Sequence, residues 1–68
     1  GVARVPAPPS ATGRAIGDLD LDSRYNVFLI ARLRADSVSF NPALAETVEQ
    51  GDIWIVAGHD DQLRALQQ

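Results

Sequence analysis

The segment at residues 25–34, YNVFLIARLR, has the most regular alternation of positions in the chain. A period of two places successive side chains on opposite faces of a β-strand. One predicted face is apolar throughout, with Val27, Leu29, Ala31 and Leu33. The other face begins apolar and ends cationic, with Phe28, Ile30, Arg32 and Arg34. A turn at 35–37 and a second strand at 38–40 complete a predicted hairpin.

The segment IWIVA at residues 53–57 lacks this alternation, because five apolar residues follow one another. A strand with one face in water should alternate apolar and polar residues. The pattern therefore predicts a strand with both faces covered. Gly51 and Asp52 favour a turn before it, where Gly permits a positive φ and the Asp carboxylate accepts backbone N–H groups. Gly58 ends the run.

Weaker patterns predict the remaining elements. Residues 2–5 form a short apolar run, and the prolines after it limit it to an edge strand. A helix is predicted over residues 13–21 from apolar residues at helical spacing, Ala15, Ile16 and Leu19, and Asp20, Asp22 and Ser23 favour a turn after it. A final helix is predicted after Gly58. His59 or Asp60 caps its N-terminus, with Gln62 placed to close the cap, and Leu63 and Leu66 form one narrow apolar stripe. Residues 43–50 fit either a helical turn or an irregular loop.

The order strand, helix, strand, strand, strand, helix predicts the fold class α+β, with a small antiparallel sheet of about four short strands and helices on one face. With 68 residues the chain makes a single domain, residues 1–68, and we expect it to be a fragment of a larger protein. A net charge of −3 and six dispersed arginines argue against nucleic-acid binding. No apolar run approaches the roughly 20 residues of a membrane-spanning helix.

Two short helices can cover only one face of this sheet, so the other face needs a second cover. From the strand at 53–57, that face carries either Trp54 and Val56 or Ile53 and Ile55. Phe28 and Ile30 of the neighbouring strand lie beside them. Either a second copy of the chain covers it, or the proline-rich segment and the loop at 43–50 lie over it. We favour a homodimer, because so short a chain has little left to spare. The predicted dimer interface is Phe28, Ile30, Trp54 and Val56.

The titratable residues do not support an enzyme or a metal site. His59 is the only histidine, and we expect it to cap a helix or face solvent. Asp18, Asp20 and Asp22 alternate as acids do in calcium-binding loops. The glycine and the distant glutamate that such loops require are missing here. A solvated or capping role is favoured for these three residues. The alternative is a cation site in a symmetric dimer, which would bring two such clusters together. Serines without a neighbouring base argue against nucleophilic catalysis. Arg32 and Arg34 are either solvated or form an anion-attracting rim.

The order of motifs along nearly the whole chain resembles the RCK C-terminal domain, also called TrkA-C. The matching positions are Gly13, Leu19, Asp20, Leu21, Arg24, Tyr25, Val27, Ala31, Pro42, Thr47, Val48, Gly51, Asp52, Gly58, Leu63 and Leu66. The resemblance implies a non-enzymatic module that dimerises through its sheet on the cytoplasmic side of a potassium channel, potassium uptake system or cation–proton antiporter. There a ligand would gate transport by changing the dimer geometry. Alternatives are an assembly module without ligand and the ligand-binding domain of a transcription regulator.

Several members of this family bind cyclic di-AMP across the dimer interface, so the resemblance implies a small-molecule effector rather than a cofactor. The corresponding positions here are Ile16, Asp20, Leu21, Asp22, Phe28, Leu29 and Pro42, to which we add Arg24 as a candidate phosphate contact. Two positions depart from the pattern. Asp22 replaces an arginine that faces phosphate, and Phe28 replaces an asparagine. A carboxylate repels a phosphodiester, so a cyclic dinucleotide is a doubtful ligand for this chain.

Overall fold

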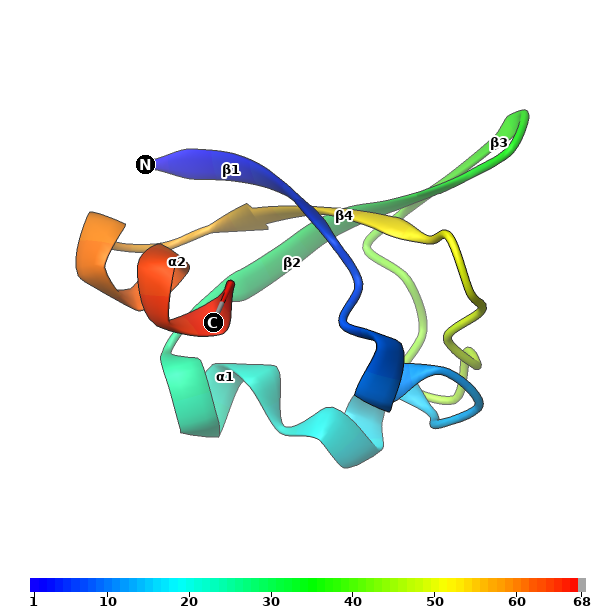
Figure 1. The fold of residues 1–68 in the computed structure, drawn as a ribbon, viewed down its shortest axis with the longest axis horizontal. Helices are drawn as coiled ribbons and strands as arrows, with labels where there is room; N and C mark the ends of the chain where they lie inside the picture. Colours follow the sequence, from blue (N-terminus) through cyan, green and yellow to red (C-terminus); the bar gives the residue numbers. More distant parts are fainter. Residues whose placement is uncertain (68) are drawn as a thin grey trace.

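The computed structural model describes residues 1–67, which form one antiparallel sheet with short helices on one side (Figure 1). The strands β1 (Val2–Pro6), β2 (Phe28–Arg34), β3 (Ser37–Phe40) and β4 (Ile53–Ala57) lie in the order β1-β4-β2-β3. The helical layer holds α1 (Leu21–Tyr25), α2 (Asp60–Leu66) and two 3-10 helices, η1 (Pro9–Ala11) and η2 (Ile16–Leu19). The predicted α+β class is confirmed.

The apolar run in β4 follows from its central place between β1 and β2. Trp54 and Val56 point into the helical layer and are 0% exposed. Val5 lies opposite Trp54, Leu29 lies opposite Val56, and both pack in the core beneath the helices. The prediction that Trp54 and Val56 contact a second protomer is therefore wrong, because the protomer itself buries them completely.

The sheet surface opposite the helices, here called the open face, carries the alternate set of side chains. By the strand register this set is Val2, Arg4, Pro6, Phe28, Ala31, Leu33, Val38, Phe40, Ile53, Ile55 and Ala57. The irregular loop at 43–50 does not lie over it, because its backbone is bonded to the helical layer. The Ile16 N–H donates to Glu46 O at 2.9 Å, and the Gly17 N–H donates to Leu44 O at 2.8 Å. The proline-rich segment also lies on the helical side, where Ala11 is part of the core.

The single helix predicted over 13–21 is wrong. Asp20 adopts a left-handed conformation with φ 50°, which separates η2 from α1. Asn26 does the same at φ 54°, so that Tyr25 belongs to α1 and the strand begins at Phe28 rather than at residue 25. Asp and Asn tolerate this region because their short polar side chains can bond locally. The predicted helix is thus shortened to η2, and α1 forms where a turn was predicted.

A register shift in β2 corrects the predicted alternation of that strand. Leu29 pairs with Val56 and Ala31 pairs with Ile55, so Ile30 is an extra residue between the two pairs. Such a bulge moves the following side chains to the other face. Arg32 is consequently buried on the helical side, where the unbroken pattern puts Leu33.

Internal ion pairs close the end of the core where β2 and β4 meet the loop. Arg32 Nε lies 2.8 Å from Glu46 Oε2, and Arg34 Nε lies 2.7 Å from Asp52 Oδ1. Asp52 is 1% exposed and also accepts the Glu49 N–H at 3.0 Å. Both expectations for the two arginines, free solvation and an anion-attracting rim, are therefore wrong. The expected backbone bond to Asp52 is present.

Candidate functional site

A cavity of about 320 Å³ lies between η2, the start of α1, the start of β2 and residues 41–44. Seven of the eight predicted ligand positions line it, namely Ile16, Asp20, Leu21, Asp22, Phe28, Leu29 and Pro42. Sequence reasoning missed four further lining residues, Gly17, Val27, Asn41 and Leu44. The structure thus brings residues from four separate segments around one space.

Local backbone geometry shapes this cavity. Asp20 turns the chain between η2 and α1 through its left-handed conformation. At Gly17 a Cβ atom would lie 3.0 Å from the Leu44 Cβ and 3.2 Å from its carbonyl oxygen. Only glycine allows the loop this close approach. Asn41, at φ 47°, directs the chain into the buried Pro42 after its N–H bonds to Ile30 O at 2.7 Å.

The charges around the cavity have one sign. Two exposed carboxylates line it, Asp20 and Asp22, and no arginine or histidine is among its lining residues in the described chain. Asp22 Oδ1 accepts the Ser23 N–H at 2.9 Å. Ile16 and Leu21 form a buried apolar floor. This arrangement suits a partly apolar ligand with hydrogen-bond donors better than a phosphodiester.

Arg24 lies outside this cavity, so its predicted role as a phosphate contact there is wrong. Its guanidinium carbon sits 5.3 Å from the centre of the Tyr25 ring, and Nη2 lies 3.5 Å from the Tyr25 hydroxyl. Two residues along an α-helix correspond to a rotation of about 200°, so Asp22 and Arg24 project from nearly opposite sides of α1. Helical periodicity applied to residues 21–25 would have separated them.

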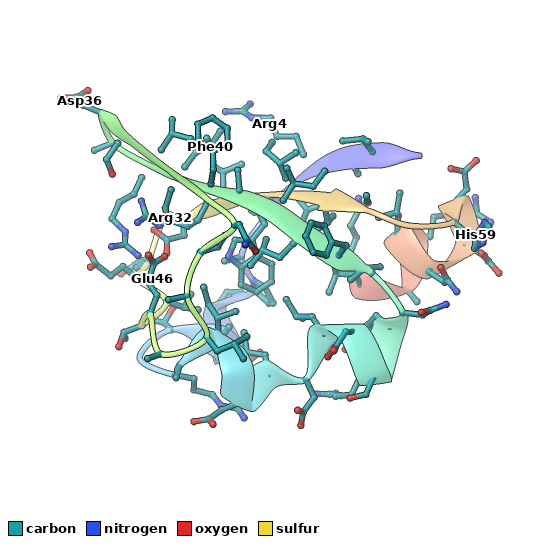
Figure 2. All side chains as sticks on the ribbon, turned by 180° about the vertical axis from the view of Figure 1, so that it is seen from behind. Arg4, Arg32, Asp36, Phe40, Glu46 and His59 are labelled. Carbon is teal, nitrogen blue, oxygen red and sulfur yellow. The ribbon has the colours of Figure 1, made fainter. Side chains whose placement is uncertain are left out.

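The open face is apolar and strongly exposed. Phe28 is 60% exposed and Phe40 is 78% exposed, and Val2 and Val38 are also exposed. Figure 2 shows Phe40 and Arg4 rising from the side of the sheet away from the helices. Of the predicted interface residues, Phe28 lies on this face, while Ile30 is half-buried at the bulge. Sequence reasoning did not include Val38 and Phe40 in the predicted interface. Their alternation with Ser37 and Ser39 in the hairpin was the signal that both lie on one face of the sheet.

His59 is the N-cap residue of α2 and is not among the residues that line the cavity. Its N–H donates to Gln62 Oε1 at 3.0 Å, which confirms the predicted capping arrangement. Among the described residues no group of three or more His, Asp or Glu side chains is placed to hold a metal ion. Within residues 1–67 no helix has the length and apolarity needed to cross a membrane.

Residues 2–68 match the TrkA-C domain family. The chain belongs to this family. The resemblance seen in the sequence, from Gly13 to Leu66, is therefore confirmed. A comparison with curated proteins gave no match.

Solved structures of TrkA-C domains share the fold. The RCK C domain of the potassium transport protein KtrA, solved in complex with cyclic diadenosine monophosphate, aligns with a TM-score of 0.94 and 30% identity over 98% of this chain and 79% of that one. The GsuK RCK domain aligns at 0.86 and 22% identity, over 96% of this chain and 15% of that one. The RCK_C dimer of S. agalactiae BusR with c-di-AMP aligns at 0.82 and 18% identity, over 93% and 86%. The last two likenesses concern the fold alone.

Proposed function

We propose that this TrkA-C domain is a homodimeric, ligand-sensing regulatory domain that acts on the cytoplasmic side of a potassium or other cation transport protein. The observation that carries this proposal is the position of Phe28. Its side chain belongs both to the 320 Å³ cavity and to the exposed open face. A second protomer covering the open face would therefore contact a residue that also contacts a bound ligand.

The exposed apolar residues of the open face support the dimer. Large exposed apolar patches usually mark contacts with partners, and a two-fold axis uses the same patch twice. The BusR structure is a dimer of RCK_C domains. Here Phe28, Val38 and Phe40 are the strongly exposed apolar residues of β2 and β3. A ligand that fits the cavity better in one dimer geometry shifts the population toward it, and the linked transport protein responds.

The ligand of this chain differs in chemistry from a cyclic dinucleotide. KtrA and BusR were solved with cyclic di-AMP, and that ligand carries two phosphodiesters. In this cavity Asp20 and Asp22 face the ligand without an arginine beside them. We therefore expect cyclic di-AMP to bind the wild-type domain weakly or not at all.

The pocket is tested by calorimetric titration of cyclic di-AMP into the wild-type domain and into Asp22→Arg. Restoring a cation at position 22 should produce saturable heat with one ligand per dimer, while the wild type gives little. A matched control is Asp18→Arg, which makes the same charge change at an exposed residue outside the cavity lining. Equal behaviour of Asp22→Arg and Asp18→Arg would contradict the assignment of the cavity.

A second candidate function is an assembly module of a transporter that dimerises without a ligand. The observation that favours it is the uncompensated pair of carboxylates at Asp20 and Asp22. Nucleosides and organic cations added at constant ionic strength should raise the melting temperature of a sensor, but not that of a ligand-free module. In a transcription regulator, the remaining alternative, the same domain would be joined to a DNA-binding segment.

A further inference from the structure

We propose that a second, smaller cavity in this domain binds a small oxyanion, such as phosphate or a carboxylate. The cavity has a volume of about 120 Å³ and lies between η1, α1, α2 and β4. Its polar lining residues are Ser10, Arg14, Arg24, Tyr25 and Trp54. At roughly 30 Å³ per water molecule, this space holds a small oxyanion with a water or two, but no nucleotide.

Two arginines give this cavity a positive charge. Arg14 Nη2 donates to the backbone oxygen of Asp18 at 2.9 Å, and Arg24 stacks on Tyr25. Neither forms an ion pair within residues 1–67, where the ion pairs belong to Arg32 and Arg34. The exposed Arg4 and Arg64 lack ion pairs as well. What sets Arg14 and Arg24 apart is that both line one cavity, which no Asp or Glu of the described residues lines.

An unpaired, buried donor on one of the lining residues is the second, independent observation. The Trp54 Nε1–H has no hydrogen-bond partner among the protein groups of the described chain, and Trp54 is 0% exposed. Trp54 lines this cavity and does not line the 320 Å³ cavity. An unpaired buried N–H costs folding free energy, which an acceptor oxygen would recover. The inner wall must part slightly for an anion to reach it, because the indole is fully covered.

The cavity is separate from the ligand pocket, and this inference does not rest on the proposed function. Residues of helix α1 line both cavities. Asp22 lines the larger cavity and Arg24 lines the smaller one, so the two charges of the helix belong to different cavities. A guanidinium recognises oxyanions through paired charge-assisted hydrogen bonds. Two guanidiniums, a hydroxyl, a phenol and an indole N–H form a donor set for an anion rather than for a cation.

The single tryptophan gives a direct assay. Sodium phosphate and sodium acetate are titrated into the ¹⁵N-labelled domain, at an ionic strength held constant with sodium chloride. The indole N–H resonance is followed by NMR. We expect a saturable shift with at least one of the two oxyanions. A response to phosphate alone would assign the phosphate class, and an equal response to acetate would include carboxylates.

Arg14→Gln and Arg24→Gln should each weaken this response about tenfold or more, since each removes a charge-assisted contact. Arg4→Gln and Arg64→Gln remove the same charge outside the cavity and should leave the response unchanged. All four arginines are exposed, so each variant should keep the wild-type melting temperature in sodium chloride.

Three results would overturn the proposal. The first is an indole resonance that no oxyanion shifts, which would mean that the donor bonds to water or to nothing. The second is a shift that chloride reproduces, which would indicate an adventitious ion only. The third is an equal loss of response in Arg4→Gln and Arg14→Gln, which would indicate general charge screening.

Discussion

Phe40→Glu tests the open face directly, because Phe40 is 78% exposed in the protomer. Phe40 is not part of the core cluster, so the change should alter the unfolding free energy of the monomer by only about 0.5 kcal/mol. In a two-fold dimer the same side chain is buried twice. At about 1.5–3 kcal/mol for each buried phenylalanine, the dimer loses about 3–6 kcal/mol. That raises the dimer dissociation constant by a factor of about 10²–10⁴.

Sedimentation equilibrium over a range of protein concentrations measures this constant, and circular dichroism checks the fold. Ala65→Glu is the matched control, since it adds the same charge at an exposed position on α2, in the opposite layer. It should leave the dimer intact. If Phe40→Glu dimerises as tightly as the wild type and Ala65→Glu, then the open face is not the interface and the argument from its exposed residues fails.

Three further predictions concern stability. Trp54→Ala should lower the free energy of unfolding by about 3–5 kcal/mol, seen as a much lower melting temperature, because it removes the largest side chain of the core. A folded, stable monomer would instead indicate that Trp54 lies in the dimer interface. Asp52→Ala should cost about 3 kcal/mol in urea unfolding, since it strips Arg34 of a buried partner, and Glu49→Ala, at an exposed pair, should cost under 1 kcal/mol. Bonds from Arg34 lower the pKa of Asp52, and bonds from Arg32 lower the pKa of Glu46, below their ordinary values near 4. Their contribution to stability is therefore complete above that pH and lost as the pH falls through the lowered pKa values; pH-independent urea midpoints from pH 5 to pH 2 would contradict this.

The elements of the sheet could be predicted because their signals are local. The run at 53–57 is a strand with two apolar faces, and the turn at 35–36 leads to the predicted hairpin partner. Which face of β4 meets the helices could not be predicted, since both faces are equally apolar in sequence. Only the pairing of Trp54 with Val5 and of Val56 with Leu29 decides it.

The remaining errors have one physical origin, which is a single residue that changes the register of the chain. Asp20 in a left-handed conformation ends the predicted helix early, and the extra residue Ile30 moves Arg32 into the core. The extra residue leaves no pattern in composition or periodicity, because it depends on how β2 pairs with β4. The residues that line the larger cavity were predicted better, because the family resemblance carries that tertiary information within it. Arg24, which we placed by side-chain chemistry alone, was the one position that failed.

The short helix α1 contributes residues to both proposed binding cavities. Asp22 faces the larger cavity and Arg24 the smaller one, so each cavity has charges of one sign even though the helix is only five residues long. Leu21 lines both cavities from the core side. A ligand that displaces Leu21 in one cavity must therefore alter the wall of the other. If both sites bind, occupancy of one should change the affinity of the other by equal factors in both directions, as thermodynamic linkage requires. Measuring phosphate affinity in Asp22→Arg, with and without saturating cyclic di-AMP, would detect that coupling, and identical affinities would show that α1 holds the two cavities apart.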